Sequence, residues 1–141
     1  GLLDDSVDAA RSVLTVPGIV VVVDGYNVTK SRWPDADPVD QRERLQQALA
    51  DASAVTGARF EVVYDGTGAG GRPARVVPSM GVHVRFTPES VEADDVVMDL
   101  AAALAADHPV VGVSSDRRVR DGLTDRGVRC LASAQLLAAL P

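Results

Sequence analysis

The sequence predicts an α/β fold in which a central, mostly parallel sheet of about five strands lies between two layers of helices. Strand-like and helix-like segments alternate along the chain, which is typical of a parallel sheet with helices on both faces. Residues 19–23 are an uninterrupted Ile and Val run, as expected of a strand buried on both faces. Three predicted strands end in or close to an acidic residue, namely Asp24, Asp65 and Asp116.

The first half of the chain contains two predicted helices and two predicted strands. Residues 4–14 have the apolar spacing of a short amphipathic helix, and a Pro-Gly pair separates it from the strand at 19–23. A polar loop at 32–38, with a Trp and two prolines, leads to a helix over residues 39–55 that a glycine ends. The next strand covers residues 59–64.

The second half begins with a Gly- and Pro-rich connection at residues 67–78, which we expect to be mobile. Alternating residues predict a third strand at 82–87, and an acidic segment then leads into an apolar helix at 96–106. The remaining elements are a buried strand at 109–113, a short helix at 117–124, a weaker strand at 128–131 and a last helix to residue 140, which Ser133 is expected to cap.

A length of 141 residues suits one domain, residues 1–141, with the leading helix and linker at 1–17 included. The first residue is Gly rather than Met, which is consistent with a piece of a longer parent protein. No apolar run approaches the length of a membrane span, and no signal-peptide pattern is present, so we expect no membrane partner.

The single cysteine, Cys130, excludes an internal disulfide and a thiolate zinc cluster, and it favours a reducing, cytoplasmic location. The net charge of −6 argues against a simple nucleic-acid coat protein, which would be basic. An enzyme that holds nucleic acid through bound cations and a local group of arginines remains compatible with this charge.

Three carboxylates, Glu92, Asp94 and Asp95, lie directly before the apolar helix. Buried like charges repel, so a fold tolerates this cluster only where water or a cation neutralises it. On a helix Glu92 and Asp95 would share a face, with Asp99 one turn on, while Asp94 would point elsewhere unless the first turn is irregular. One interpretation is a site for a hard cation, and the alternative is an acid-rich helix start in water.

Parallel strands bring their C-terminal ends to one edge of the sheet, so the acidic residues at these ends should converge. The candidate metal ligands are Asp24, Glu92, Asp94, Asp95 and Asp116, with Asp65 near them. Oxygen ligands without His or Cys at ligand spacing favour one or two Mg²⁺ or Mn²⁺ ions. Two such ions would activate water and stabilise the leaving oxygen of a phosphodiester.

Polar and aromatic residues near these acids have both structural and functional interpretations. Asn27 is either a turn residue or a group that orients Asp24 or a metal-bound water. Ser114 and Ser115 either cap the helix after them or contact a phosphate. Tyr26 either packs or stacks on a base. The arginines are solvated individually, but as a set they are candidate phosphate clamps: Arg72, Arg75, Arg117, Arg118 and Arg120.

Four short motifs occur in a characteristic order: Asp-Gly-Tyr-Asn at 24–27, Tyr-Asp-Gly at 64–66, Glu-Ala-Asp-Asp at 92–95 and Ser-Ser-Asp at 114–116. Over roughly residues 19–140 the chain thereby resembles the YacP-like NYN domain of the PIN-like nuclease superfamily. The last two motifs are also similar to the 5′-nuclease domain attached to bacterial DNA polymerase I.

This resemblance implies a PIN-like three-layer α/β/α sandwich and a metal-dependent ribonuclease. It implies an acidic core of Asp24, Asp94 or Asp95, and Asp116. Glu92 matches the acidic position ahead of the Asp pair, and Asn27 matches the Asn beside the first Asp. Relatives that bind structured RNA or ribosomes often add basic segments, whereas this chain is acidic, so other domains of a longer parent chain are expected to supply binding.

We therefore expect endonucleolytic hydrolysis of RNA phosphodiester bonds. Two alternatives remain open: a catalytically silent RNA- or protein-binding module on the same fold, and a metal-dependent phosphohydrolase that acts on small substrates.

Overall fold

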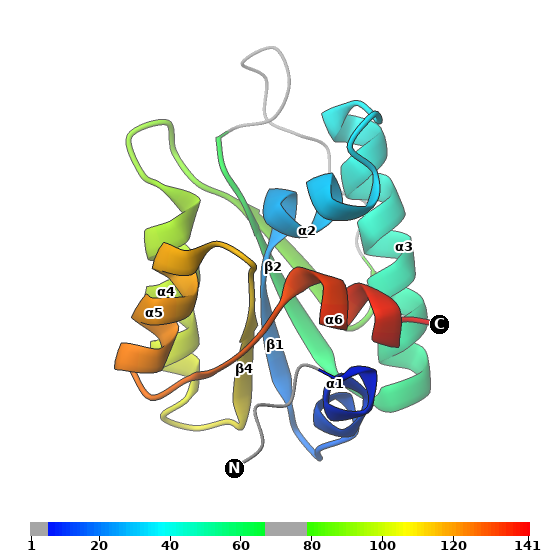
Figure 1. Cartoon of the computed structure of the whole chain (residues 1–141), viewed down its shortest axis with the longest axis vertical. Coiled ribbons are helices and arrows are strands. Elements are labelled where there is room, and N and C mark those ends of the chain that lie inside the picture. Colours follow the sequence, from blue (N-terminus) through cyan, green and yellow to red (C-terminus); the bar gives the residue numbers. More distant parts are fainter. Residues whose placement is uncertain (1–5, 67–78) are drawn as a thin grey trace.

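Five parallel strands form one sheet in the order β3-β2-β1-β4-β5 in the computed structural model, which describes residues 6–66 and 79–141 (Figure 1). The strands are β1 (Val20–Asp24), β2 (Arg59–Tyr64), β3 (Val82–Phe86), β4 (Val110–Val113) and β5 (Arg129–Leu131). The predicted α/β fold with a central parallel sheet is thereby confirmed. The connection at 67–78, which we expected to be mobile, lies outside the described residues.

Helices cover both faces of the sheet and make the fold a three-layer sandwich (Figure 1). One face packs against helices from the two ends and the first half of the chain: α1 (Val7–Leu14), α2 (Gly25–Arg32), α3 (Pro38–Thr56) and α6 (Ser133–Ala139). The other face packs against α4 (Ala93–Leu104) and α5 (Arg117–Asp125).

The central strand β1 explains why the sequence carries an uninterrupted Val run. Val21 and Val23 belong to the core on the α1, α2, α3 and α6 side, whereas Val20 and Val22 belong to the core under α4 and α5. Because β1 pairs with both β2 and β4, both of its faces and both of its edges are covered. Only the C-terminal end of the strand is left to present a polar side chain.

Two local features differ from the sequence expectations. Helix α2 was not predicted, because it lacks an apolar repeat and buries only Gly25, Val28 and Thr29. It follows β1 so closely that a Cβ on Gly25 would lie 2.4 Å from Cε1 of Tyr64, so glycine is required there. The prediction that Ser133 caps the last helix was wrong, since the N-cap of α6 is Ala132 and Ser133 is its first residue.

None of the helices in the part of the chain that the structure describes is both long enough and apolar enough to cross a bilayer.

Candidate active site

The candidate site lies where the strand order reverses. From β1 the chain builds outward through β2 and β3, then crosses to the other side of β1 to form β4 and β5. In open α/β sheets the crevice beyond the carboxyl ends of the strands at this reversal is the usual ligand site. Asp24 is the last residue of β1, and Ser114 directly follows β4.

A cavity of about 290 Å³ opens at this edge, and we call it the carboxylate pocket. It is lined by Asp24, Tyr26, Asp65, Glu92, Ala93 and Asp94. Four of these six side chains are carboxylates from three separate segments. Four of the acids predicted to converge at the strand ends therefore meet here, whereas Asp95 and Asp116 lie outside the lining.

Asp24 is the buried member of the acidic group, with 7% of its surface exposed. Burial is the main reason that its pKa is raised from 3.8 to about 6, since a low-dielectric surrounding disfavours the charged form. A hydrogen bond from Ser114 lowers the pKa, while the charges of Asp94, Asp116 and Asp65 raise it. These carboxylates therefore lie close enough to repel one another.

Ser114 connects the two strand ends at the centre of the site. Its buried hydroxyl donates to Oδ2 of Asp24 at 2.8 Å and accepts from the backbone N–H of Asp116 at 3.1 Å. Asp116 in turn caps α5, because its Oδ1 accepts from the N–H of Val119 at 3.2 Å. The hydroxyl thus fixes the orientation of one acid directly and of the other through the backbone.

Asn27 holds two loops against α2. Its Oδ1 accepts from the backbone N–H of Ser115 at 2.8 Å and from the hydroxyl of Ser133 at 2.7 Å. The hydroxyl of Ser115 accepts from the N–H of Ser133 at 2.9 Å, which closes the network. Asn27 and Ser115 therefore position the loops after β4 and β5, and we call this network the Asn27 brace.

Arg118 lies against all three acids at the start of α4. Its guanidinium donates to Asp95 at 2.8 Å, to Asp94 at 3.2 Å and to Glu92 at 3.4 Å. These contacts, that with Asp95 first, raise the pKa of Arg118. We expected Asp94 to point away from Glu92 on a regular helix. Glu92 is instead the N-cap, outside the helix that begins at Ala93, and both side chains line the carboxylate pocket.

The other predicted residues are more dispersed. Asp99 pairs with Arg126 at 3.4 Å, and Arg117 is almost fully exposed, with Asp121 at 3.8 Å. Arg120 donates to the backbone carbonyl of Ser114 at 3.4 Å. Arg72 and Arg75 lie outside the described residues.

The donor chemistry of the pocket fits a hard divalent cation, because every candidate ligand is a carboxylate oxygen. Within residues 6–66 and 79–141, no group of three or more His, Cys, Asp or Glu side chains is arranged to hold one ion. Mg²⁺ keeps several waters and binds proteins through one or two carboxylates, so a complete protein cage is not required. Such an ion would neutralise the negative charges of Asp94, Asp116 and Asp65, which repel the ionised form of Asp24.

Ser133 was not among the candidate site residues, and Ser114 was expected to cap a helix or contact a phosphate rather than to bind Asp24. Both serines are buried at this edge of the sheet. Ser114 is the first residue after β4, and Ser133 is the second residue after β5. That position was the available signal, although Ser is so common after strands that it does not identify a partner.

Comparisons with known proteins agree with this fold. The YacP-like NYN domain family matches residues 21–141. The crystal structure of Rae1 (YacP) from Bacillus subtilis has 27% sequence identity to this chain and a TM-score of 0.66, covering 84% of this chain and 71% of that one. A mutant of the same Bacillus protein gives 26% identity and a TM-score of 0.67, with 84% and 72% covered. A comparison with curated proteins found no match.

Proposed function

The chain belongs to the YacP-like NYN domain family, which is nuclease-like, and on this basis we propose that it is a metal-dependent endoribonuclease that hydrolyses RNA phosphodiester bonds. The observation that supports this most strongly is the placement of Asp24, Asp94 and Asp116 around one edge of the sheet. A buried carboxylate whose pKa is raised by burial and by neighbouring carboxylates, in a pocket open to solvent, is expected where a site binds cations and transfers phosphoryl groups.

In this proposal Asp24, Asp94 and Asp116 hold Mg²⁺ or Mn²⁺, with Glu92 and Asp95 beside them at the rim. A bound ion would supply positive charge that stabilises the phosphoryl oxygens during hydrolysis. Ser114 keeps the Asp24 carboxylate oriented and favours its ionised form through its 2.8 Å hydrogen bond. Because the pKa of Asp24 is about 6, this side chain is mostly ionised at neutral pH and loses its charge in mild acid.

Arg118 has a second role in the proposal. Its exposed guanidinium neutralises the rim acids in the free protein and can exchange them for a substrate phosphate, for which its planar fork is well suited. Ribosome binding and a contribution from further domains of a longer parent chain stay predictions.

The test compares the wild type with Asp116→Asn, using Mn²⁺ and two RNA substrates. One is an end-labelled single-stranded oligonucleotide and the other is a covalently closed circle, which only an endonuclease can cut. We expect the wild type to open the circle, a chelator to stop the reaction, and Asp116→Asn to lose activity by about 100-fold or more. The control is Asp107→Asn, an exposed acid between α4 and β4, which should retain full activity.

Three outcomes would contradict the proposal. Equal cleavage by the wild type and Asp116→Asn would remove Asp116 from the site. RNA binding without cleavage would indicate a silent binding module. Hydrolysis of p-nitrophenyl phosphate with no cleavage of RNA would indicate a small-substrate phosphohydrolase.

A further inference from the structure

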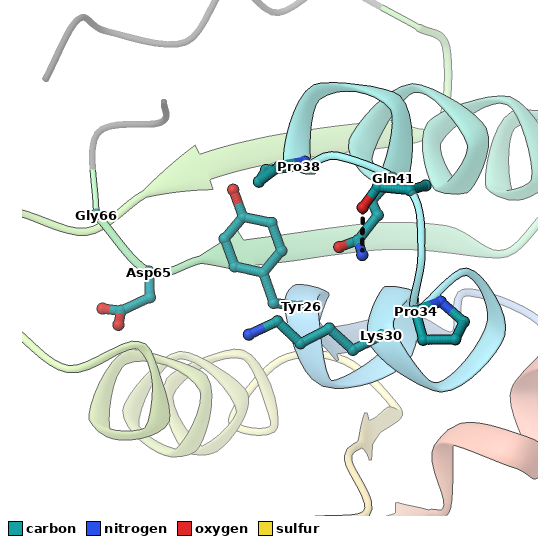
Figure 2. Close-up of a pocket in the computed structure, with 8 residues that line it drawn as sticks. Tyr26, Lys30, Pro34, Pro38, Gln41, Asp65 and Gly66 are labelled. Carbon is teal, nitrogen blue, oxygen red and sulfur yellow. Dashed lines mark hydrogen bonds between the residues drawn. The ribbon is translucent and has the colours of Figure 1, made fainter. Parts of the chain in front are cut away.

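A second hollow, of about 550 Å³, adjoins the carboxylate pocket and shares Tyr26 and Asp65 with it. We call it the Tyr26 hollow (Figure 2). Its lining comes from α2, the loop to α3, the start of α3 and the end of β2: Tyr26, Lys30, Pro34, Ala36, Pro38, Gln41, Asp65 and Gly66. A volume of this order lies in the range of roughly 300–1,000 Å³ that accommodates small ligands.

Tyr26 and the prolines give the hollow apolar walls beside its polar lining residues, and the Tyr26 ring is held in place by its neighbours. The Tyr26 ring packs at 4.7 Å and 52° against Tyr64, and its hydroxyl accepts from Arg42 at 2.8 Å. Figure 2 shows the ring between the Pro38 and Lys30 sides of the hollow. A fixed aromatic ring with prolines beside it offers a flat apolar surface, which is what an unstacked nucleobase requires.

Gln41 keeps the loop between α2 and α3 in this shape. It is 4% exposed, its side-chain amide donates to the carbonyls of Trp33 at 2.9 Å and Ala36 at 3.2 Å, and its oxygen accepts from Thr29 at 2.9 Å. These bonds fix the backbone that carries Pro34 and Pro38. The hollow is therefore formed before any ligand arrives, and binding there costs little ordering of the chain.

Lys30 supplies a positive charge at the hollow, and it is the only lysine in the sequence. Its Nζ lies 5.7 Å from the centre of the Tyr26 ring, and the side chain extends past Tyr26 toward the Asp65 side (Figure 2). Within the described residues Lys30 forms no salt bridge, whereas Arg118 is engaged by three carboxylates. The ammonium group is thus available to an anion from outside.

We propose that the Tyr26 hollow binds one unpaired nucleotide of single-stranded RNA, next to the bond that is cut at the carboxylate pocket. The base lies against Tyr26 and the prolines, and Lys30 binds the phosphate. This inference rests on the proposed function. It also explains how an acidic site holds an anionic chain, because the binding energy comes from stacking and from one well-placed cation beside the acids. A duplex cannot fill the hollow, since its bases are already paired and stacked.

The first experiment uses the single lysine as a reporter. Asp116→Asn protein, which should bind without cutting, is treated with an amine-acetylating reagent, and the Lys30 product is measured by peptide mass spectrometry, with the N-terminal amine as internal reference. We expect a saturating single-stranded 10-mer to slow acetylation of Lys30 by about fivefold or more, as for a direct phosphate contact, and a duplex of the same sequence to leave it unchanged. No protection, or equal protection by the duplex, would overturn the subsite.

The second experiment measures binding of the same 10-mer by fluorescence polarisation at several salt concentrations. Lys30→Ala should weaken binding and reduce the slope of log K against log salt by about 0.7, the value for one phosphate contact on a single strand. The control is Arg32→Ala, which removes the same charge from the same helix but not from the hollow, and its slope should decrease less. Equal slopes for both variants would overturn the assignment of Lys30.

These readouts separate the subsite from the nuclease proposal. If the wild type cuts RNA but Lys30 is not protected, the subsite is wrong and the nuclease stands. If Lys30 is protected by single-stranded RNA but the wild type cuts no RNA, the nucleotide subsite stands and the hydrolytic role is wrong.

Discussion

Replacement of Asp24 by Asn is expected to stabilise the metal-free protein at neutral pH while it abolishes RNA cleavage. Asp24 is buried beside other acids, and its pKa is raised from 3.8 to about 6. The folded state therefore holds the Asp24 proton more tightly than the unfolded state does. Asparagine keeps the shape and can still accept the hydrogen bond from Ser114, but it carries no charge.

The size of the effect follows from the two pKa values. Each pKa unit of difference between the folded and unfolded states is worth about 1.4 kcal/mol, so the ionised Asp24 costs about 3 kcal/mol of unfolding free energy. Well below pH 3.8 the group is protonated in both states and the cost is absent, and the cost grows between pH 3.8 and 6, where mainly the unfolded state has lost the proton. As the pH rises through 6 the folded state must give up the proton, and above that pH the full cost applies. The difference between Asp24→Asn and the wild type should therefore grow from less than about 1 kcal/mol at pH 4 to about 3 kcal/mol at pH 8.

The assay is urea unfolding followed by circular dichroism at pH 4, 6 and 8, with a chelator present. Asp107→Asn, an exposed acid outside the site, is the control and should show no such pH trend. Repeating the pH 8 measurement with Mn²⁺ should stabilise the wild type more than the variant, because an ion that binds only the folded state adds to its stability. An Asp24→Asn variant that is less stable at pH 8, or that differs equally at all three pH values, would refute the electrostatic argument.

Three other substitutions have defined outcomes. Ser114→Ala should lower the unfolding free energy by about 1–3 kcal/mol. It should also shift the acid limb of the pH–rate profile to higher pH, because Asp24 loses a hydrogen bond that lowers its pKa. Arg118→Ala should tighten Mn²⁺ binding in calorimetry by about two- to fivefold, because the substitution removes the guanidinium that competes with Mn²⁺ for Asp94 and Asp95. Gly25→Ala should lower the melting temperature and cost about 1–3 kcal/mol, because the new methyl group overlaps the Tyr64 ring.

Each of these outcomes has a contradicting result. An unchanged acid limb in Ser114→Ala would mean that another group controls it. Arg117→Ala removes a neighbouring, more exposed cation that does not contact the rim acids, so it should leave Mn²⁺ affinity unchanged. An equal gain in both variants would reflect net charge alone. A wild-type melting temperature for Gly25→Ala would show that the Tyr64 ring moves freely.

The sheet was predictable because its signals are local and strong. A run of Val that must be buried on both faces favours a central parallel strand, and an acid at the end of that strand must then lie at the edge where ligands bind. Asp24 could thus be placed beside Asp116 from the alternation of strands and helices, and the structure brings them close enough to interact.

What could not be predicted depends on packing between distant segments. Helix α2 has no apolar stripe, and tertiary contacts hold it. Arg118 reaches the acids because α5 packs beside α4, and neither helix carries that information alone. The hydrogen bond between Asn27 and Ser133 joins residues 106 positions apart, so no spacing rule leads to it.

The Asn27 brace bears on the order in which this edge of the sheet is assembled. One amide oxygen early in the chain holds the loops that follow β4 and β5, and the second of these loops opens into α6. A growing chain that has emerged only to residue 132 already contains every acid of the pocket, yet it lacks the serine that completes the brace. Within the described fold, the brace is therefore completed only after residue 133 has been made, later than every acid of the pocket.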